Sequence, residues 1–311
     1  MRTPTRRRLL QVSAGLASLG VGPAVPGRLR YRWTGSALGA AASLDLYHDD
    51  RAEAARLVAR MVAEVDRLEA IFSLQRTTSA LARLNRDGRL VQPPVELVAV
   101  LETAASFSAV SDGAFDVTVQ PLWRLLAAAG AQGSVPDGRA VAGALARVGW
   151  RRLDVGRRSI GFARPGMAAT LNGIAQGYIT DRIAGLLRDA GLEDALVELG
   201  ETRAMGRPPE SAWRVVTPVG PVALAERALA VSSARPADCG LAGSSPNLIS
   251  ARTGLPVLDG RTVVVGAPSA MLADAASTAL AASERAAMGH LAARLAPLGI
   301  TVFSAPHLGD A

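Results

Sequence analysis

The chain has 311 residues, of which 49% are hydrophobic and 20% are charged, so it is long enough and apolar enough to bury a large core. The formal net charge of +7 points toward a nucleic-acid partner, but its distribution argues against that class. All basic residues are arginines, a group of them falls within the first 32 residues, and no basic stripe interleaved with aromatic residues follows.

The N-terminal segment has the pattern of a targeting signal. The basic stretch Arg6-Arg7-Arg8 is followed by a weakly apolar run from Leu9 to about Val25, and then by Gly and Arg residues. The paired arginines resemble the twin-arginine export signal. We therefore predict a signal segment over residues 1–30 and a periplasmic domain over residues 31–311. An uncleaved basic tail is the alternative.

The rest of the chain mixes strand and helix patterns without strict alternation. Helices are predicted, in chain order, over residues 51–72, 79–86, 93–111, 121–130, 138–147, 174–190, 270–283 and 284–296. Strands are predicted over residues 36–47, 151–155, 158–162, 194–199, 212–218, 228–233, 261–267 and 299–304. We expect an α+β fold, in which a mixed sheet with flanking helices forms one compact unit of one lobe or two.

Cysteine and histidine are scarce. Cys239 is the only cysteine, so neither an intrachain disulfide nor a thiolate zinc site is possible. The three histidines, His48, His290 and His307, supply a histidine-based metal site or a Ser/His/Asp triad poorly. We therefore expect no zinc.

Residues 112–118 form the first segment with chemical potential. Asp112-Gly113 breaks a helix and leads into a polar cluster that contains Asp116 and Thr118. Such a turn allows backbone amides and a carboxylate to face one ligand, although Asp-Gly turns are also common as simple helix ends.

Residues 171–181 form the second segment. Gly173 and Gly177 lie at the change from loop to helix, where they allow close backbone approach and leave helix N-terminal amides for an anion. Neither a Walker loop nor a GxGxxG dinucleotide loop is present. Close packing of a helix start is the alternative interpretation.

Residues 269–278 form the third segment. Ser269 can cap a helix on which Asp274 and Thr278, four residues apart, share one face. A carboxylate and a hydroxyl are hard donors suited to Mg²⁺ beside a phosphate. The spacing alone, in a stretch of Ala, Met and Leu, favours a carboxylate that points into solvent.

Together, and in this order, the three segments resemble the ApbE family of FAD:protein FMN transferases. Gly113–Thr118 matches its Gly-x-Phe-Asp-x-Thr element, residues 170–181 match most of its Asp-Leu-Gly-Gly-Ile-Ala-Lys-Gly-Tyr-x-x-Asp stretch, and Ala273–Ala279 matches Ala-Asp-Ala-x-x-Thr-Ala. Leu199–Gly206 is similar to the NosX-like branch, which serves nitrous-oxide reductase. The resemblance covers nearly the whole mature chain and implies a T-fold-related domain.

The resemblance also implies a mechanism and site residues. FAD binds as substrate with Mg²⁺ against its pyrophosphate, a Thr or Ser hydroxyl of an acceptor flavoprotein attacks the FMN phosphorus, and AMP leaves. Asp274 and Thr278 are the implied catalytic residues, and the Gly173 carbonyl joins them as a metal ligand. The implied FAD-binding residues are Leu38, Ala114, Phe115, Asp116, Gln176, Asp181 and Ile249.

Two departures from the family pattern affect this interpretation. Gln176 replaces the usual Lys. In the stretch that corresponds to His-x-x-Asp-Pro-Arg-Thr-Gly, Asn247 and Ser250 replace the His and the Asp. Loss of a general base typically lowers a rate by about 10²–10⁴-fold. None of the three histidines is near this stretch in sequence.

Three alternatives stay open at this point: an FAD-binding accessory protein without transferase activity, an FAD pyrophosphatase, and an exported scaffold without a ligand. A NosR-like membrane protein is one candidate acceptor, and no nucleic-acid partner is expected.

Overall fold

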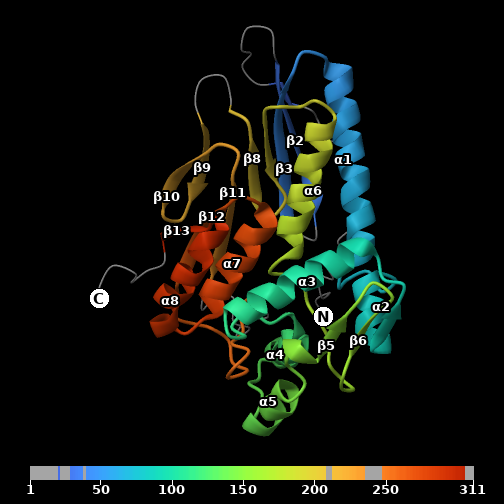
Figure 1. Ribbon diagram of the computed structural model, residues 1–311, viewed down its shortest axis with the longest axis vertical. Coiled ribbons are helices and arrows are strands. Elements are labelled where there is room, and N and C mark those ends of the chain that lie inside the picture. Colours follow the sequence, from blue (N-terminus) through green and yellow to red (C-terminus); the bar gives the residue numbers. More distant parts are fainter. Residues whose placement is uncertain (1–19, 22–28, 38–39, 208–211, 235–246, 305–311) are drawn as a thin grey trace, which may run out of the picture.

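The structure is a computed structural model that describes residues 20–21, 29–37, 40–207, 212–234 and 247–304. Leu38, Cys239 and His307 lie outside these ranges. A large sheet and the helices packed against it form the upper part of the view in Figure 1, and a smaller group of helices and short strands lies below α3.

The large sheet has eight strands in the order β1-β2-β3-β7-β8-β11-β12-β13. Their bounds are Gly20–Val21, Leu29–Ala37, Ala40–His48, Ala195–Glu198, Thr202–Met205, Ala228–Ser233, Thr262–Ala267 and Thr301–Ser304. All described neighbours pair antiparallel, so the expected mixed sheet is wrong. The two helical connections, from β3 to β7 and from β12 to β13, each bring the chain back antiparallel to the strand that it left.

The N-terminal edge of the sheet differs from the predicted single strand at 36–47. β2 and β3 form a hairpin in which Ala37 pairs with Ala40. Tyr31 and Trp33 of β2 are buried, so this strand belongs to the core. The predicted boundary at residue 30 falls inside β2, which begins at Leu29.

Helices α1 (Arg51–Phe72), α6 (Ala175–Asp189) and α7 (Ala270–Ala282) pack against the large sheet (Figure 1). The α1 helix buries residues three or four apart, among them Leu57, Met61 and Leu68, as the periodicity predicts. Helices α3 (Val95–Val110) and α8 (Arg285–Leu295) lie against the C-terminal half of α7.

The smaller part contains α2, α4 and α5, with bounds Ala80–Asp87, Gln120–Ala131 and Gly138–Leu145. Its three-stranded sheet has the order β4-β6-β5, with bounds Arg89–Val91, Ser159–Phe162 and Leu153–Val155. One continuous core includes Leu90 and Ile160 of this part as well as Leu44 of the large sheet, so the described chain forms one unit. A satellite cluster around Leu122 lies outside that core.

The predicted helices are all present, within one or two residues of their expected ends. The short strands β4, β8 and β10 (Gly220–Leu224), the last paired with β9 (Trp213–Thr217), were not predicted. These strands are three to five residues long, too short for an alternating pattern to stand out. Within the described ranges, no helix combines the length and apolarity that a membrane span needs.

Candidate functional site

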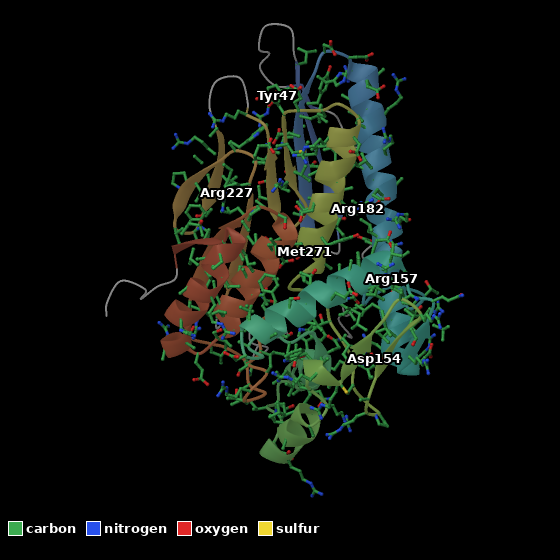
Figure 2. The ribbon with its side chains drawn as sticks, viewed as in Figure 1. Tyr47, Asp154, Arg157, Arg182, Arg227 and Met271 are labelled. Carbon is green, nitrogen blue, oxygen red and sulfur yellow. The ribbon has the colours of Figure 1, made fainter. Side chains whose placement is uncertain are left out.

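The N-terminal turns of α6 and α7 touch through glycine. A Cβ added at Gly177 would lie 2.3 Å from the Ala270 carbonyl oxygen, so only glycine allows the two helices to approach this closely. Met271, labelled in Figure 2, lies at this crossing. A Cβ at Gly173 would lie 2.8 Å from the Thr278 hydroxyl oxygen. The two predicted glycines therefore bring the second segment directly against the third.

Asp274 is buried at this crossing, and one of its carboxylate oxygens accepts a 3.1 Å hydrogen bond from the Gly177 amide. The expectation from spacing alone, a carboxylate in solvent, is therefore wrong, because α7 is covered by α6 and the sheet. Burial raises the pKa of Asp274 to about 8 against the opposing effect of this hydrogen bond.

A second carboxyl, Glu201, is buried close to Asp274. Burial, and secondly the nearby Asp274 carboxyl, raises the pKa of Glu201 well above its ordinary value. Two neighbouring carboxyls without a cationic side chain cannot both be ionised at low cost. A bound cation would remove this conflict.

Hydroxyl groups complete the cluster. The Ser232 hydroxyl lies 2.8 Å from the hydroxyl of Ser277 and 3.5 Å from that of Thr278. Thr278 is only half-buried, so its hydroxyl is at the accessible edge. We call this group the oxygen-rich centre; its members are Gly173, Glu201, Ser232, Asp274, Ser277 and Thr278.

The donor set of the oxygen-rich centre fits Mg²⁺, which prefers carboxylate, hydroxyl, carbonyl and water oxygens. In the described part of the chain, no three His, Cys, Asp or Glu side chains gather into a complete metal site. An ion here would therefore need further oxygens from a ligand or from water, as Mg²⁺ bound beside substrate phosphates does.

Asp181 and Gln176 support this centre from α6. The Asp181 carboxylate accepts hydrogen bonds from the amides of Ala270 (2.8 Å) and Met271 (2.9 Å), and so caps the start of α7. Burial raises the pKa of Asp181, and these two hydrogen bonds oppose the shift. The side-chain amide of Gln176 lies over Gly200, where a Cβ would be 2.5 Å from its nitrogen.

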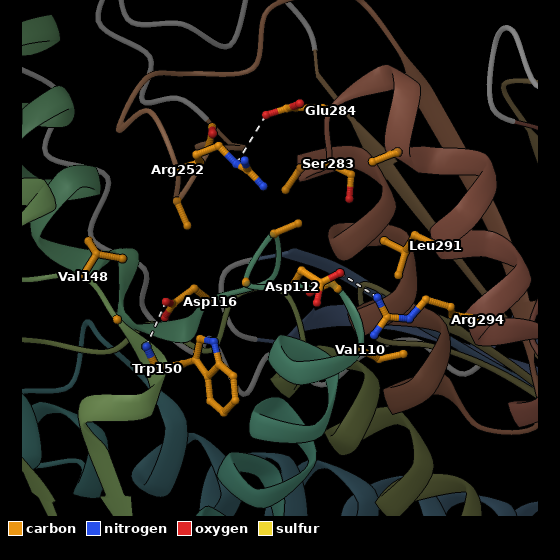
Figure 3. Close-up of a pocket in the computed structure, with 18 of the residues that line it drawn as sticks. Val110, Asp112, Asp116, Val148, Trp150, Arg252, Ser283, Glu284, Leu291 and Arg294 are labelled. Atoms are coloured by element: carbon orange, nitrogen blue, oxygen red, sulfur yellow. Dashed lines mark hydrogen bonds and ion pairs between the residues drawn. The ribbon is translucent and has the colours of Figure 1, made fainter.

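A cavity of about 370 Å³ lies between the first segment, the loop after residue 247 and α8 (Figure 3). We call it the α8 cavity. Its lining includes Asp112, Gly113, Ala114, Asp116, Val148, Gly149, Trp150, Arg151, Ser250, Ala251, Arg252, Ala282, Ser283, Glu284, Ala287, His290, Leu291 and Arg294. Its size is within the range of ligand pockets.

Two ion pairs cross parts of this cavity and are visible in Figure 3. Arg252 is 3.3 Å from Glu284, and Arg294 is 2.6 Å from Asp112. The Arg151 guanidinium lies 4.4 Å from the Trp150 ring centroid. The charged groups of the cavity are therefore largely compensated, and the Trp150 ring offers an aromatic face.

Asp116 holds the wall of the cavity together. One carboxylate oxygen accepts from the Thr118 amide (2.7 Å) and hydroxyl (2.6 Å), and the other from the Trp150 amide (2.9 Å). Burial raises the pKa of Asp116, whereas these hydrogen bonds lower it. The carboxylate thus fixes the turn that presents Trp150, instead of standing free to receive a ligand.

Phe115 and Ile249 are turned away from the α8 cavity. Phe115 packs against Phe107 with ring centroids 6.1 Å apart, and Ile249 packs in the satellite cluster with Leu122 and Val148. Their neighbours Ala114 and Ser250 line the cavity instead. Contact of Phe115 or Ile249 with FAD stays a prediction, as does that of Leu38, which lies outside the described residues.

Helix α7 contributes residues both to the oxygen-rich centre and to the α8 cavity. Asp274, Thr278 and Ala282 are spaced four residues apart, and Ala282 lines the α8 cavity. At 1.5 Å per residue, Asp274 and Ala282 are about 12 Å apart along the helix axis. The oxygen-rich centre and the wall of the α8 cavity are therefore about two helical turns apart on α7.

The family resemblance predicted that Gly173, Asp274 and Thr278 belong to one group, and the structure places Gly173 against Thr278 and Asp274 one turn earlier on the same helix. Their role as metal ligands stays a prediction. Two further pairs of site residues were not predicted from the sequence. Glu201 and Ser232 enter from strands β8 and β11 and their connections, and Trp150 and His290 enter from segments far apart in sequence. The Leu199–Gly206 motif was the one signal that could have found Glu201.

Comparison with known proteins identifies the family of this chain. The model of the ApbE family matches residues 38–302. A FAD:protein FMN transferase of Klebsiella pneumoniae (strain 342) is 30% identical over 207 residues, which are 62% of this chain and 58% of that protein. One of Treponema pallidum (strain Nichols) is 34% identical over 141 residues, 42% of this chain and 39% of that protein.

Two solved structures share the fold. The flavinyl transferase ApbE of Pseudomonas stutzeri, in its apo form, has a TM-score of 0.76 at 23% identity, over 90% of this chain and 93% of that one. The flavin transferase ApbE of Vibrio cholerae has a TM-score of 0.75 at 22% identity, over 88% and 93%. The chain aligns with less than two thirds of the length of the curated relatives named above.

Proposed function

Because this chain belongs to the ApbE family, we propose that it transfers FMN from FAD to a Thr or Ser hydroxyl of an acceptor flavoprotein and releases AMP. The observation that carries this proposal is the buried oxygen-rich centre on α7, which lies one to two helical turns from Ala282 in the wall of the α8 cavity. The pyrophosphate of FAD would lie at the oxygen-rich centre, and one of its ring systems would lie in the α8 cavity.

Asp274, Thr278 and the Gly173 carbonyl are the residues that would hold Mg²⁺. When bound, the ion would neutralise charge that develops on the bridging oxygens of the substrate. The chain supplies orientation: Gly177 holds the Asp274 carboxylate through its amide, and Asp181 fixes the start of α7. The burial of Asp274 also keeps water away from this side of the site.

The α8 cavity would hold a ring of FAD. Trp150 offers an aromatic face beside Gly113, whose missing Cβ leaves space next to the indole nitrogen. Ring stacking on an aromatic side chain contributes about 1–3 kcal/mol of binding free energy. Ala114 lines this cavity, which supports its predicted contact with FAD. Asp116, whose carboxylate is held by Thr118 and Trp150, would act by fixing the wall of the cavity.

One experiment separates this function from its rivals. The protein is titrated with FAD by flavin fluorescence, then incubated with FAD, Mg²⁺ and a candidate acceptor domain, and the acceptor mass and released AMP are measured. Transfer predicts an acceptor heavier by one FMN and an equal amount of AMP. Free FMN with AMP indicates a pyrophosphatase, and binding without either product indicates an accessory protein. No saturable binding up to high micromolar FAD contradicts all of these flavin functions.

We also propose that the protein is exported to the periplasm by the twin-arginine route and serves nitrous-oxide reductase, with a NosR-like membrane protein as its acceptor. The Arg6-Arg7 pair and the similarity of Leu199–Gly206 to the NosX-like branch support this proposal. Replacement of Arg6 and Arg7 by Lys should hold the precursor in the cytoplasm. Normal periplasmic accumulation of that double variant would refute this route.

A further inference from the structure

The α8 helix presents one continuous face to the α8 cavity. Ala287, His290, Leu291 and Arg294 all line it, and their spacing of three or four residues is that of a single helix face. The opposite wall includes Ser250, Ala251 and Arg252. Arg252 is tied to the residue before α8, Glu284, by a 3.3 Å ion pair.

This opposite wall belongs to the stretch in which the family pattern has a His and an Asp. Here those positions are Asn247 and Ser250, neither of which is a good proton acceptor. The chain nevertheless brings a histidine to the same cavity from another element, because His290 and Ser250 both line it. A base absent from this loop can thus be supplied from α8, because Ser250, three residues after position 247, lines the cavity together with His290.

The other described histidine is unsuitable for this role. His48 ends β3, and its Nδ1 accepts a 2.9 Å hydrogen bond from the Asp50 amide. It does not line the α8 cavity. Within the described part of the chain, His290 makes no hydrogen bond that would occupy its ring nitrogens.

The carboxylates of the cavity are already engaged. Asp112 pairs with Arg294, Glu284 pairs with Arg252, and Asp116 accepts three hydrogen bonds. The charged groups that line the cavity together with His290 are these three carboxylates and the guanidinium groups of Arg151, Arg252 and Arg294. Imidazole is the side chain best suited to accept a proton near neutral pH.

We propose that His290 is the general base of the transfer and replaces the histidine that is absent at position 247. The inference rests on the proposed function. A ring nitrogen of His290 takes the proton of the acceptor hydroxyl while that oxygen forms a bond to the FMN phosphorus. The bond from this phosphorus to the bridging oxygen breaks, AMP leaves with the electron pair, and the proton passes from the imidazolium to water.

The position of Ala282 gives this step its location. Thr278 and Ala282 are one turn apart on α7, about 6 Å along the axis, and Ala282 lines the same cavity as His290. The phosphorus that is attacked would lie beside Thr278. The acceptor hydroxyl would approach it along the α8 side of the cavity, past His290, while the FAD ring would lie on the Trp150 side.

The test compares His290→Gln with His48→Gln as the matched control. For His290→Gln we expect a transfer rate at least about 100-fold lower, loss of the acid limb of the rate–pH profile, and unchanged FAD affinity and thermal midpoint. His48→Gln should transfer at the wild-type rate. Adding Asn247→His to His290→Gln returns the histidine of the family pattern to its own position and should restore transfer.

An NMR readout is independent of activity. Addition of FAD and Mg²⁺ should shift the imidazole C–H signals of His290 and leave those of His48 in place. The inference is overturned if His290→Gln transfers within a few-fold of wild type, or if the His290 signals do not respond. Failure of the proposed function is distinguishable, since wild type itself would then transfer no FMN.

Discussion

The oxygen-rich centre and the α8 cavity are built in different ways. The centre is formed mainly by two short segments, 171–181 and 269–278, and its shape depends on backbone contacts at Gly173 and Gly177. The cavity is lined by residues from four separate stretches, and exposed ion pairs such as Arg252–Glu284 cross it. Substitutions in the centre should therefore affect metal response and stability, whereas substitutions in the cavity should change affinity and rate.

The largest effect is expected at Asp274, in the centre. Asp274→Ala should lower transfer by about 10²–10³-fold or more and remove the Mg²⁺ dependence of FAD binding, because the one carboxylate that faces the metal position on α7 is lost. The measurement is AMP release and FAD titration with and without Mg²⁺.

Asp274→Asn separates charge from structure in this experiment. The amide keeps an acceptor for the Gly177 N–H, whose loss in Asp274→Ala leaves a buried amide unsatisfied at a cost of about 1–3 kcal/mol. We expect Asn to be as inactive as Ala but more stable in urea. A wild-type Mg²⁺ response in either variant would show that Asp274 is not a metal ligand.

The next effect is on stability and tests the backbone contact itself. Gly177→Ala would place its Cβ 2.3 Å from the Ala270 carbonyl oxygen, so α6 and α7 must separate, at a cost of about 1–3 kcal/mol or more. Gly185, in the same helix, has nothing within 4 Å of an added Cβ. Gly185→Ala should therefore stabilise by about 0.5–1 kcal/mol.

Urea unfolding of these two alanine variants gives a direct comparison. Equal midpoints for Gly177→Ala and Gly185→Ala would mean that the crossing of α6 and α7 is not close-packed. The oxygen-rich centre would then not depend on the backbone contact at Gly177.

This contrast also explains what the sequence could predict. The helices follow from local signals, because periodicity and capping are written in adjacent residues. The contact of Gly173 with Thr278 joins segments far apart in the sequence and was expected only from the family resemblance. The burial of Asp274 could not be predicted from its helix alone, since α6 and the sheet cover it. The role of Asp116 was missed for the same reason: its partner Trp150 is 34 residues away.

The cavity was the least predictable part. His290 and Ser250 lie 40 positions apart in sequence, and only the packing of α8 against the end of α7 makes them line one space. No local sequence motif predicts that His290 and Ser250 line the same cavity. A cavity lined by side chains from distant elements therefore needs the tertiary structure, whereas each helix start of the oxygen-rich centre carries a local signal of its own.

A smaller effect is expected at Trp150, on the cavity side. Trp150→Ala should weaken FAD binding by about 1–3 kcal/mol, roughly 10- to 100-fold, while leaving its Mg²⁺ dependence intact. Trp150→Phe keeps an aromatic face and should bind with near wild-type affinity. Fluorescence titration of both variants is the measurement. If Ala and Phe bind FAD equally well, the ring does not stack on a flavin or adenine.

The smallest effect concerns the loop that supports the cavity rim. The Asp259 carboxylate accepts hydrogen bonds from Arg261 (2.8 Å) and Arg285 (3.0 Å), and Arg261 also donates to the carbonyl oxygen of Ser283, which lines the cavity. The hydrogen bonds from Arg261 lower the pKa of Asp259 from its ordinary value of 3.8 to about 2. The folded state thus binds this proton less tightly than the unfolded state does.

The sign of the pH dependence follows from this shift. A carboxyl whose pKa is lower in the folded state contributes stability that is present above 3.8 and is lost as the pH falls through about 2. Asp259→Asn should therefore cost about 1 kcal/mol at pH 7, since the pair is partly exposed, and the difference from wild type should vanish near pH 2. Asp154→Asn, at an exposed position on β5 (Figure 2), is the control and should change neither value. Urea midpoints at pH 7, 3.5 and 2 test this window. If the difference between wild type and Asp259→Asn persists unchanged at pH 2, Asp259 stabilises the rim through its shape and not through its charge.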